Sequence, residues 1–146
     1  MAAPTYTWSY VENIFGMTDV PKVATMEAST SLETKIGTAL IITSGQLDEA
    51  TASVTKLFGL AMEATTAAAT AADPIKVMVL RPGDVIKGTA DADASTLSGF
   101  NGVLGDFNSD GSLDVADTTD GCLGVLRTED SGLTVYCVPS IGAIIG

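Results

Sequence analysis

The sequence contains no histidine, and its 7 Lys and Arg residues are outnumbered by 18 Asp and Glu residues, so that the net charge is −11. Histidine is the side chain that most readily acts as a base near neutral pH, and its absence removes the commonest catalytic base. Binding a phosphate backbone needs clustered Lys and Arg, which this chain has too few residues to supply. We therefore expect neither an enzyme nor a protein that binds nucleic acid.

Cysteine is also scarce. Cys122 and Cys137 are too few for a disulfide framework, and their spacing is not that of metal ligands. We expect both thiols to be reduced and buried in strands, in a protein made in a cytoplasm. Residues 1–20 lack the basic and apolar regions of a signal peptide, and no apolar run is long enough to cross a bilayer. We expect no membrane partner.

Motifs that bind nucleotides are missing as well. The sequence contains neither G-x-x-x-x-G-K-[ST] nor G-x-G-x-x-G, so we expect no cofactor. The segment DADAS, residues 91–95, places two carboxylates two positions apart. Its polar, Gly- and Ala-rich surroundings favour a solvated loop over a pair of catalytic acids. The sequence therefore indicates no catalytic residue.

Val, Ile, Thr and Gly are abundant, which is typical of short strands joined by tight turns. The alternation of β-branched residues is clearest in IKVMVL, residues 75–80. Tight turns are predicted at Ser44-Gly45 and Pro82-Gly83. The predicted strands are 22–28, 37–43, 47–50, 56–63, 75–80 and 85–86, with loops at 65–73 and 88–102, in one domain from residue 21 to residue 146.

Part of the chain is duplicated. Residues 44–63 align with residues 110–129, with Leu47-Asp48 over Leu113-Asp114 and, after a one-residue slip, LFGL over CLGV. The segment IKVMVLRPGDVI also aligns with LTVYCVPSIGAI. Two units that each have one apolar face can bury those faces together. The sequence therefore predicts an all-β fold, a small β-barrel or sandwich built from two repeated β units at about 37–87 and 103–145.

The N-terminal segment is rich in aromatic residues. Tyr6, Trp8, Tyr10 and Phe15 are four of the eight in the chain. In an extended segment the first three fall on one face, because side chains alternate along a strand. Aromatic residues are favoured anchors at interfaces. Residues 1–20 are therefore predicted to form an extended arm in which these four side chains bind a partner. The alternative is that they pack back onto their own domain.

Residues 106–117 have the spacing of a calcium-binding loop. The matching residues are Asp106, Asn108, Asp110, Gly111 and Asp117, with Asp114 at the ninth position. Calcium loops of this kind lead into a helix, whereas TTDGCLGVL continues in a β pattern. We favour the alternative, a β-turn at Asn108–Gly111, and assign no metal ligand. A calcium-dependent, dockerin-like module stays as a second hypothesis.

The repeated units resemble the bacteriophage capsid decoration (cement) proteins, small β-barrel proteins on the outside of a capsid shell. The resemblance rests on SGQLDEAT, KLFGLAMEA, IKVMVLRPGDVIKG, NSDGSLDVADTTDGCLGVL and LTVYCV, and it covers roughly residues 20–140. It implies a structural protein of the virion exterior that binds the major capsid protein, often as a homotrimer, and stabilises the shell. It implies no active site. The alternatives are a calcium-dependent binding or adhesion module and a tail or fibre module.

Overall fold

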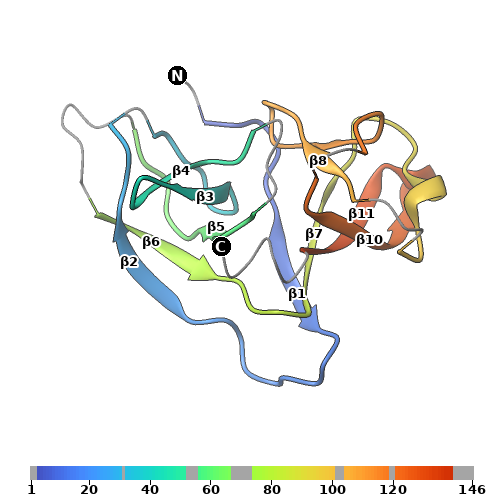
Figure 1. The fold of residues 1–146 in the computed structure, drawn as a ribbon, viewed down its shortest axis with the longest axis horizontal. Helices are drawn as coiled ribbons and strands as arrows, with labels where there is room; N and C mark the ends of the chain where they lie inside the picture. The colour runs from blue at the N-terminus through green and yellow to red at the C-terminus, as the bar shows by residue number, and fades with distance from the viewer. Residues whose placement is uncertain are drawn as a thin grey trace.

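The computed structural model describes residues 3–30, 32–51, 56–66, 74–100, 104–118 and 121–139. These residues form strands β1 to β11 and no α-helix, with two 3₁₀ turns at Ser95–Leu97 and Asp130–Gly132. Figure 1 shows the strands gathered into two bodies that lie side by side, with β1 between them. The predicted all-β fold is confirmed.

The first body is a five-stranded antiparallel sheet in the order β2-β6-β5-β3-β4. A parallel bridge between Ala28 and Leu47 brings the chain after β2 against β4, so that the sheet closes on itself. We call this body the first barrel. Its strands are β2 (Val23–Glu27), β3 (Ala39–Thr43), β4 (Gln46–Glu49), β5 (Gly59–Ala61) and β6 (Pro74–Val79).

The second body has the same strand order. β7 pairs with β11 and β11 with β10, a bridge between Gly105 and Leu123 joins β10 to the start of β8, and β8 pairs with β9. A parallel bridge between Ala90 and Leu113 then returns to the end of β7. We call this body the second barrel. Its strands are β7 (Asp84–Thr89), β8 (Asp106–Phe107), β9 (Leu113–Asp114), β10 (Leu123–Glu129) and β11 (Thr134–Pro139).

Hydrogen bonds match at the point where each barrel closes. Ser29 donates its backbone N–H to the Leu47 carbonyl at 2.9 Å, and Asp91 donates to the Leu113 carbonyl at 2.9 Å. Each bond lies beside the parallel bridge of its own barrel. Leu47 and Leu113 are therefore equivalent, which is how the sequence alignment matches them.

The alignment of β5 with β10 is wrong by one residue. Phe58 donates its N–H to the Leu40 carbonyl at 2.9 Å, and Cys122 donates to the Gly105 carbonyl at 3.0 Å. In each barrel, the residue that follows the donor pairs with the residue whose carbonyl accepts this hydrogen bond. Phe58 and Cys122 are therefore equivalent, whereas the sequence alignment places Leu57 over Cys122.

The alignment of β6 with β11 is wrong by two residues. Val77 pairs with Ala24, and Cys137 pairs with Ile86. Ala24 and Ile86 each precede the closing bridge of their barrel by the same number of residues, so Val77 is equivalent to Cys137. The sequence alignment places Val77 over Val135 instead. A shift of two residues keeps every side chain on the same face of a strand, so the alternating pattern cannot detect it.

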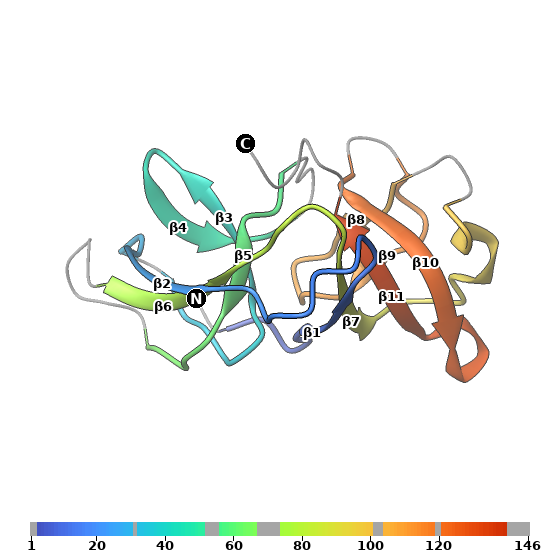
Figure 2. The same ribbon diagram turned by 90° about the horizontal axis from the view of Figure 1, so that it is seen from below.

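The buried side chains form two clusters. The smaller cluster lies in the first barrel and includes Leu40, Leu47 and Val77. The larger cluster lies in the second barrel and also takes in Leu57 and Leu60 from the first, so that the two barrels share buried contacts. Figure 2 shows the two barrels side by side in a second view. Both cysteines are buried and free, as expected, but only Cys137 lies in a strand, since Cys122 precedes β10. Burial, with the nearby Asp106 carboxylate adding to it, raises the pKa of the Cys122 thiol to about 12.

Candidate partner-binding surface

The N-terminal segment packs against the domain. Strand β1 (Ser9–Asn13) pairs antiparallel with β7, and Trp8, just before it, is only 3% exposed. The Trp8 Nε1–H donates to the Gly111 carbonyl at 2.8 Å, and the indole meets Phe107 edge-on with ring centroids 5.7 Å apart. The prediction of a free extended arm is not confirmed. Trp8 packs onto its own domain, as in the alternative interpretation, and leaves only a small part of its surface open to solvent.

Trp8 fills a position that the second barrel leaves without a side chain. A Cβ atom added to Gly88 in β7 would overlap the indole ring. Gly88 pairs with Val135 in the second barrel as Met26 pairs with Ile75 in the first. Met26 packs against the core of the first barrel with its own side chain. The N-terminal segment therefore supplies the group that completes the second core.

The other three aromatic residues keep part of their surface in solvent. Tyr6 donates its backbone N–H to the Asp110 carbonyl at 2.8 Å, and its side chain stays exposed. Tyr10 is half-buried beside Arg81, whose guanidinium lies 6.0 Å from the ring centroid. Phe15 is 67% exposed. A role for these three side chains in binding a partner stays a prediction.

The connection between β1 and β2 exposes several large apolar side chains. Phe15 and Val20 are two-thirds exposed, and Ile14 and Met17 are exposed as well. We call residues 14–20 the apolar loop. Apolar side chains gathered in solvent on a folded domain commonly mark a site of interaction, because water contact with them is unfavourable. Of these residues, sequence reasoning singled out Phe15 alone.

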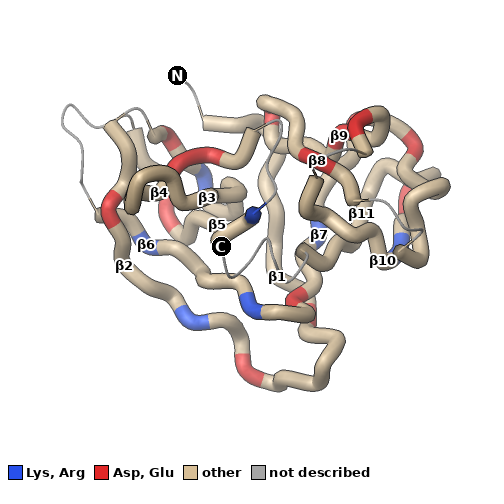
Figure 3. Tube along the Cα trace, viewed as in Figure 1, with Lys and Arg blue, Asp and Glu red and all other residues tan. Residues whose placement is uncertain are grey.

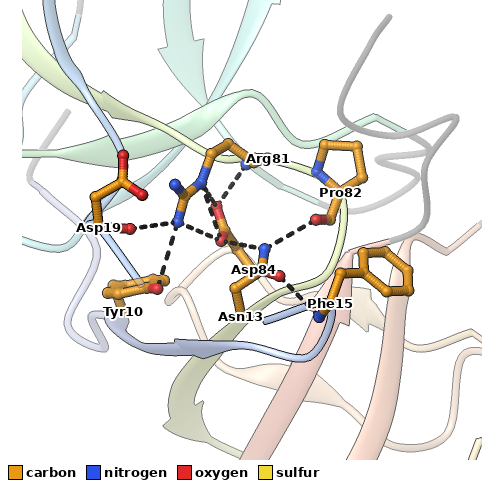
Figure 4. Close-up of polar contacts among 7 residues, drawn as sticks. All are labelled: Tyr10, Asn13, Phe15, Asp19, Arg81, Pro82 and Asp84. Atoms are coloured by element: carbon orange, nitrogen blue, oxygen red, sulfur yellow. Dashed lines mark hydrogen bonds and ion pairs between the residues drawn. The ribbon is translucent and has the colours of Figure 1, made fainter. Parts of the chain in front are cut away.

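A buried carboxylate, Asp84, holds the start of the apolar loop in place (Figure 4). Asp84 is fully buried and accepts hydrogen bonds from the Asn13 Nδ2 at 2.9 Å and from the Arg81 Nη2 at 3.0 Å. The Asn13 side chain in turn donates to the Pro82 carbonyl at 3.0 Å and accepts from the Phe15 N–H at 2.8 Å. The carboxylate therefore fixes the backbone from which Phe15 projects. We call Asn13, Arg81 and Asp84 the polar clamp.

Arg81 holds the other end of the same loop. Its Nη2 donates to the Asp19 carbonyl at 2.9 Å and lies 3.4 Å from the Tyr10 hydroxyl, as Figure 4 shows. Hydrogen bonding to Asp84 is the main cause that raises the pKa of the Arg81 guanidinium above its usual value. The Phe15 ring also packs against Gly83, where a Cβ would collide with it. The loop is thus anchored at both ends, so its apolar side chains are held ready for a partner.

An apolar groove of about 230 Å³ lies beside β1 and β6. Val23, which follows the loop and is half exposed, pairs with Met78, and Met78 lines the groove. The groove is lined by Trp8, Ser9, Tyr10, Ile36, Gly37, Leu60, Met62 and Met78. Ile36 is mostly exposed at its rim. The apolar loop, Val23 and the groove together form a candidate surface for a partner that offers apolar side chains.

The candidate calcium loop is a hairpin turn. Gly111 donates its N–H to the Asn108 carbonyl at 3.0 Å, as in a β-turn over Asn108–Gly111. Asp110 accepts from the Ser112 N–H at 3.0 Å, and Asp114 accepts from the Ala116 N–H at 3.1 Å. These two acidic side chains accept hydrogen bonds from nearby backbone N–H groups. The part of the chain that the structure describes holds no group of acids placed for a metal ion. The turn interpretation is confirmed.

The acids of residues 91–95 also hold turns. Asp91 accepts from the Val115 N–H at 3.1 Å and from the Asn108 Nδ2 at 3.0 Å. Asp93 accepts from the Ser95 side chain and backbone, and these hydrogen bonds lower the pKa of its carboxyl group. Asp91 therefore joins two loops of the second barrel, whereas Asp93 stabilises its own turn.

No helix among the described residues is long and apolar enough to cross a membrane. The candidate surface consists of the apolar loop, which the polar clamp anchors, and the apolar groove. Comparison with known proteins adds no family to this description, since no family model, no curated protein and no solved structure matches the chain.

Proposed function

We propose that the chain is a structural decoration protein that binds the outer surface of a bacteriophage capsid and stabilises the shell, with no catalytic role. The observation that carries the proposal is the apolar loop, whose side chains are exposed and whose backbone is hydrogen-bonded at both ends to the polar clamp. The resemblance of the repeated β units to capsid decoration proteins supports it. The major capsid protein is the proposed partner.

A shell offers the same contact many times, so a trimer could bind through three linked copies of a modest interface, and linked contacts raise the overall affinity. Ordering a loop at the moment of binding reduces affinity, because its conformational entropy is then lost. The bonds from Asn13, Arg81 and Asp84 order the apolar loop beforehand. Aromatic and Met side chains such as Phe15 and Met17 are common at interface cores. We also propose that the protein assembles as a trimer on the shell.

The test is co-sedimentation of the purified chain with capsids assembled from the major shell protein of the same viral source. The double variant Phe15→Ser, Met17→Ser removes two exposed apolar side chains of the loop. We expect it to bind at least about tenfold more weakly, the loss of about 1.4 kcal/mol. The matched control is Leu133→Ser, because Leu133 is an exposed apolar residue of the second barrel outside the loop. The control should bind like the original chain.

Thermal unfolding of all three proteins separates lost binding from lost folding. A wild-type chain that stays in the supernatant, or a loop variant that sediments as well as Leu133→Ser, rejects the proposal. Attachment to purified tails or fibres in place of capsids would assign the chain to another part of the virion. The mass of the purified protein in solution tests the trimer directly.

A further inference from the structure

One edge of β2 is open. The Val79 N–H donates to the Lys22 carbonyl at 2.9 Å, so Lys22 faces β6 with its backbone. Backbone groups alternate in direction along an antiparallel strand, and residues 24 and 26 therefore face β6 as well. The backbone groups of Val23 and Thr25 point the other way, as do those of Glu27, which lies beside the bridge to β4. Among the described residues, no strand pairs with β2 on that side before the bridge at Ala28.

The equivalent edge of the second barrel is covered. Val85 and Lys87 of β7 occupy the positions of Val23 and Thr25, counted back from the closing bridges. On β7 these residues pair with β1: Ser9 lies opposite Lys87, and Glu12 lies opposite Val85. The repeat thus shows what this edge accepts, namely an extended antiparallel segment that adds one strand outside the barrel.

We propose that the open edge of β2 binds an extended, basic segment of a partner chain as an added antiparallel strand. The exposed N–H and C=O groups of an edge strand are satisfied in full by another strand, and added strands are a recurrent mode of peptide recognition. Many proteins block such edges with Lys or Pro. The edge residues 23–27 contain neither, and Figure 1 shows β2 at the outer margin of the first barrel.

Charge around the open edge favours a basic segment. Glu27 is exposed at the end of β2, and β4 on the far side of the opening carries Asp48 and Glu49. Ser29, just after the bridge, lies 3.4 Å from the Asp48 carboxylate through its hydroxyl, which places that acid beside the end of β2. The acidic groups therefore lie at the β4 end of the edge, while Lys22 precedes β2 and Lys76 belongs to β6 on the closed side. A strand that bears Lys or Arg would therefore find opposite charge at this edge.

The test uses the full chain and a synthetic probe peptide. The probe has about nine alternating Val and Lys residues, enough for one strand. Hydrogen exchange followed by NMR reports each backbone amide separately. In the free protein the amides of Val23 and Thr25 should exchange fast, while those of Val85 and Lys87 are protected by β1. Addition of the probe should slow exchange at Val23 and Thr25, and a peptide with Glu in place of Lys should leave both unchanged.

A matched pair of variants isolates the backbone contact. Thr25→Pro removes a donor that faces the open edge and leaves the bonds to β6 in place, because proline is tolerated at an edge where its N–H is not needed. Thr25→Ala changes the side chain and keeps the donor. We expect the probe to bind Thr25→Ala like wild type and Thr25→Pro at least about tenfold more weakly.

Several outcomes would overturn the proposal. Unchanged exchange in the wild-type chain with saturating probe rejects the added strand, and equal effects of the Lys and Glu peptides reject the basic segment. Protection of Val23 and Thr25 that grows with protein concentration alone would assign the edge to a second copy of the chain. The exchange pattern of the wild-type chain decides these cases even if Thr25→Pro fails to fold. The capsid assignment does not enter this test.

Discussion

The first and second barrels share one strand order but complete their cores in different ways. The first barrel contributes Met26 from its own strand β2, whereas the second has Gly88 at the equivalent place and receives Trp8 from the N-terminal segment. One of two similar units can thus lack a core side chain when a segment outside the unit supplies one. The core of the second barrel thus depends on a residue that precedes the first barrel in the chain.

The same N-terminal segment also makes the surfaces of the two barrels different. It covers the edge of β7, and the polar clamp at Asp84 then turns the chain into the apolar loop. The position equivalent to Asp84 in the first barrel is Lys22, which is exposed. Acidic residues occur on both barrels, as Figure 3 shows. The difference between the barrels therefore lies in what covers them, since their strand order and acidity are shared.

Removing Trp8 should expose the dependence of the second barrel most strongly. Trp8→Ala deletes a buried ring and its hydrogen bond to Gly111, and substitutions of this kind cost about 3–5 kcal/mol of stability. Urea unfolding followed by far-UV circular dichroism measures the loss without relying on tryptophan fluorescence. A loss below about 1 kcal/mol would show that the indole is not essential to the core.

A pair of substitutions tests whether a Met side chain, as in the first barrel, can replace Trp8 in the core of the second barrel. Gly88→Met places the side chain of the first barrel in β7, and with Trp8 present it should destabilise the fold by about 1–3 kcal/mol through overpacking. In the Trp8→Ala background the same change should restore part of the lost stability. If the stability losses of Trp8→Ala and Gly88→Met simply add, the two positions are not coupled. A Met side chain at position 88 would then not replace the indole in the core.

Substitution in the polar clamp should have the next largest effect. Asp84→Asn keeps the size of the side chain but turns an amide toward donors from Asn13 and Arg81, which should cost about 1.5–3 kcal/mol. The equivalent change in the first barrel, Lys22→Gln, removes an exposed charge and should cost less than about 0.5 kcal/mol. Urea unfolding of both variants makes the comparison. Equal losses would mean that the clamp adds nothing to the second barrel.

Much of the strand pattern was predictable from the sequence, because alternation and turn residues are local properties. The turn at Ser44-Gly45 and the strand β6 are examples, and both lie as predicted. The packing of Trp8 was not predictable, because an alternating aromatic segment does not reveal which surface it covers. Gly88, against which the indole packs, is far away in the sequence. Nothing in the residues around Gly88 indicates that another side chain occupies the space beside it.

The candidate surface was predictable only in part. Phe15 stood out as an aromatic residue near the N-terminus, but Ile14, Met17 and Val20 lie in no recognisable motif. The polar clamp joins Asn13 to Asp84, residues that are 71 positions apart. A hydrogen bond between distant segments leaves no periodic trace in the sequence. The clamp could therefore be recognised only once β1 was seen to pair with β7.

The smallest expected effect concerns the acidic side of the first barrel. Burial, followed by repulsion from Asp48, raises the pKa of Glu49 in the folded protein. A carboxyl group whose pKa is raised by folding binds its proton more tightly in the folded state than in the unfolded state. Ionisation of Glu49 therefore lowers stability as the pH rises through its folded pKa, and this penalty is absent below the unfolded value.

Glu49→Gln should accordingly stabilise the protein at neutral pH and leave its stability unchanged at about pH 3, below the usual pKa of a glutamate. Because Glu49 is partly open to solvent, the gain should be no more than about 0.5 kcal/mol. Urea unfolding at the two pH values measures it, with Glu129→Gln at the exposed end of β10 as the control in the second barrel. If both substitutions stabilise equally at neutral pH, the gain comes from the lower net charge of the whole chain. A gain confined to Glu49→Gln would locate the repulsion at β4, beside the open edge of β2.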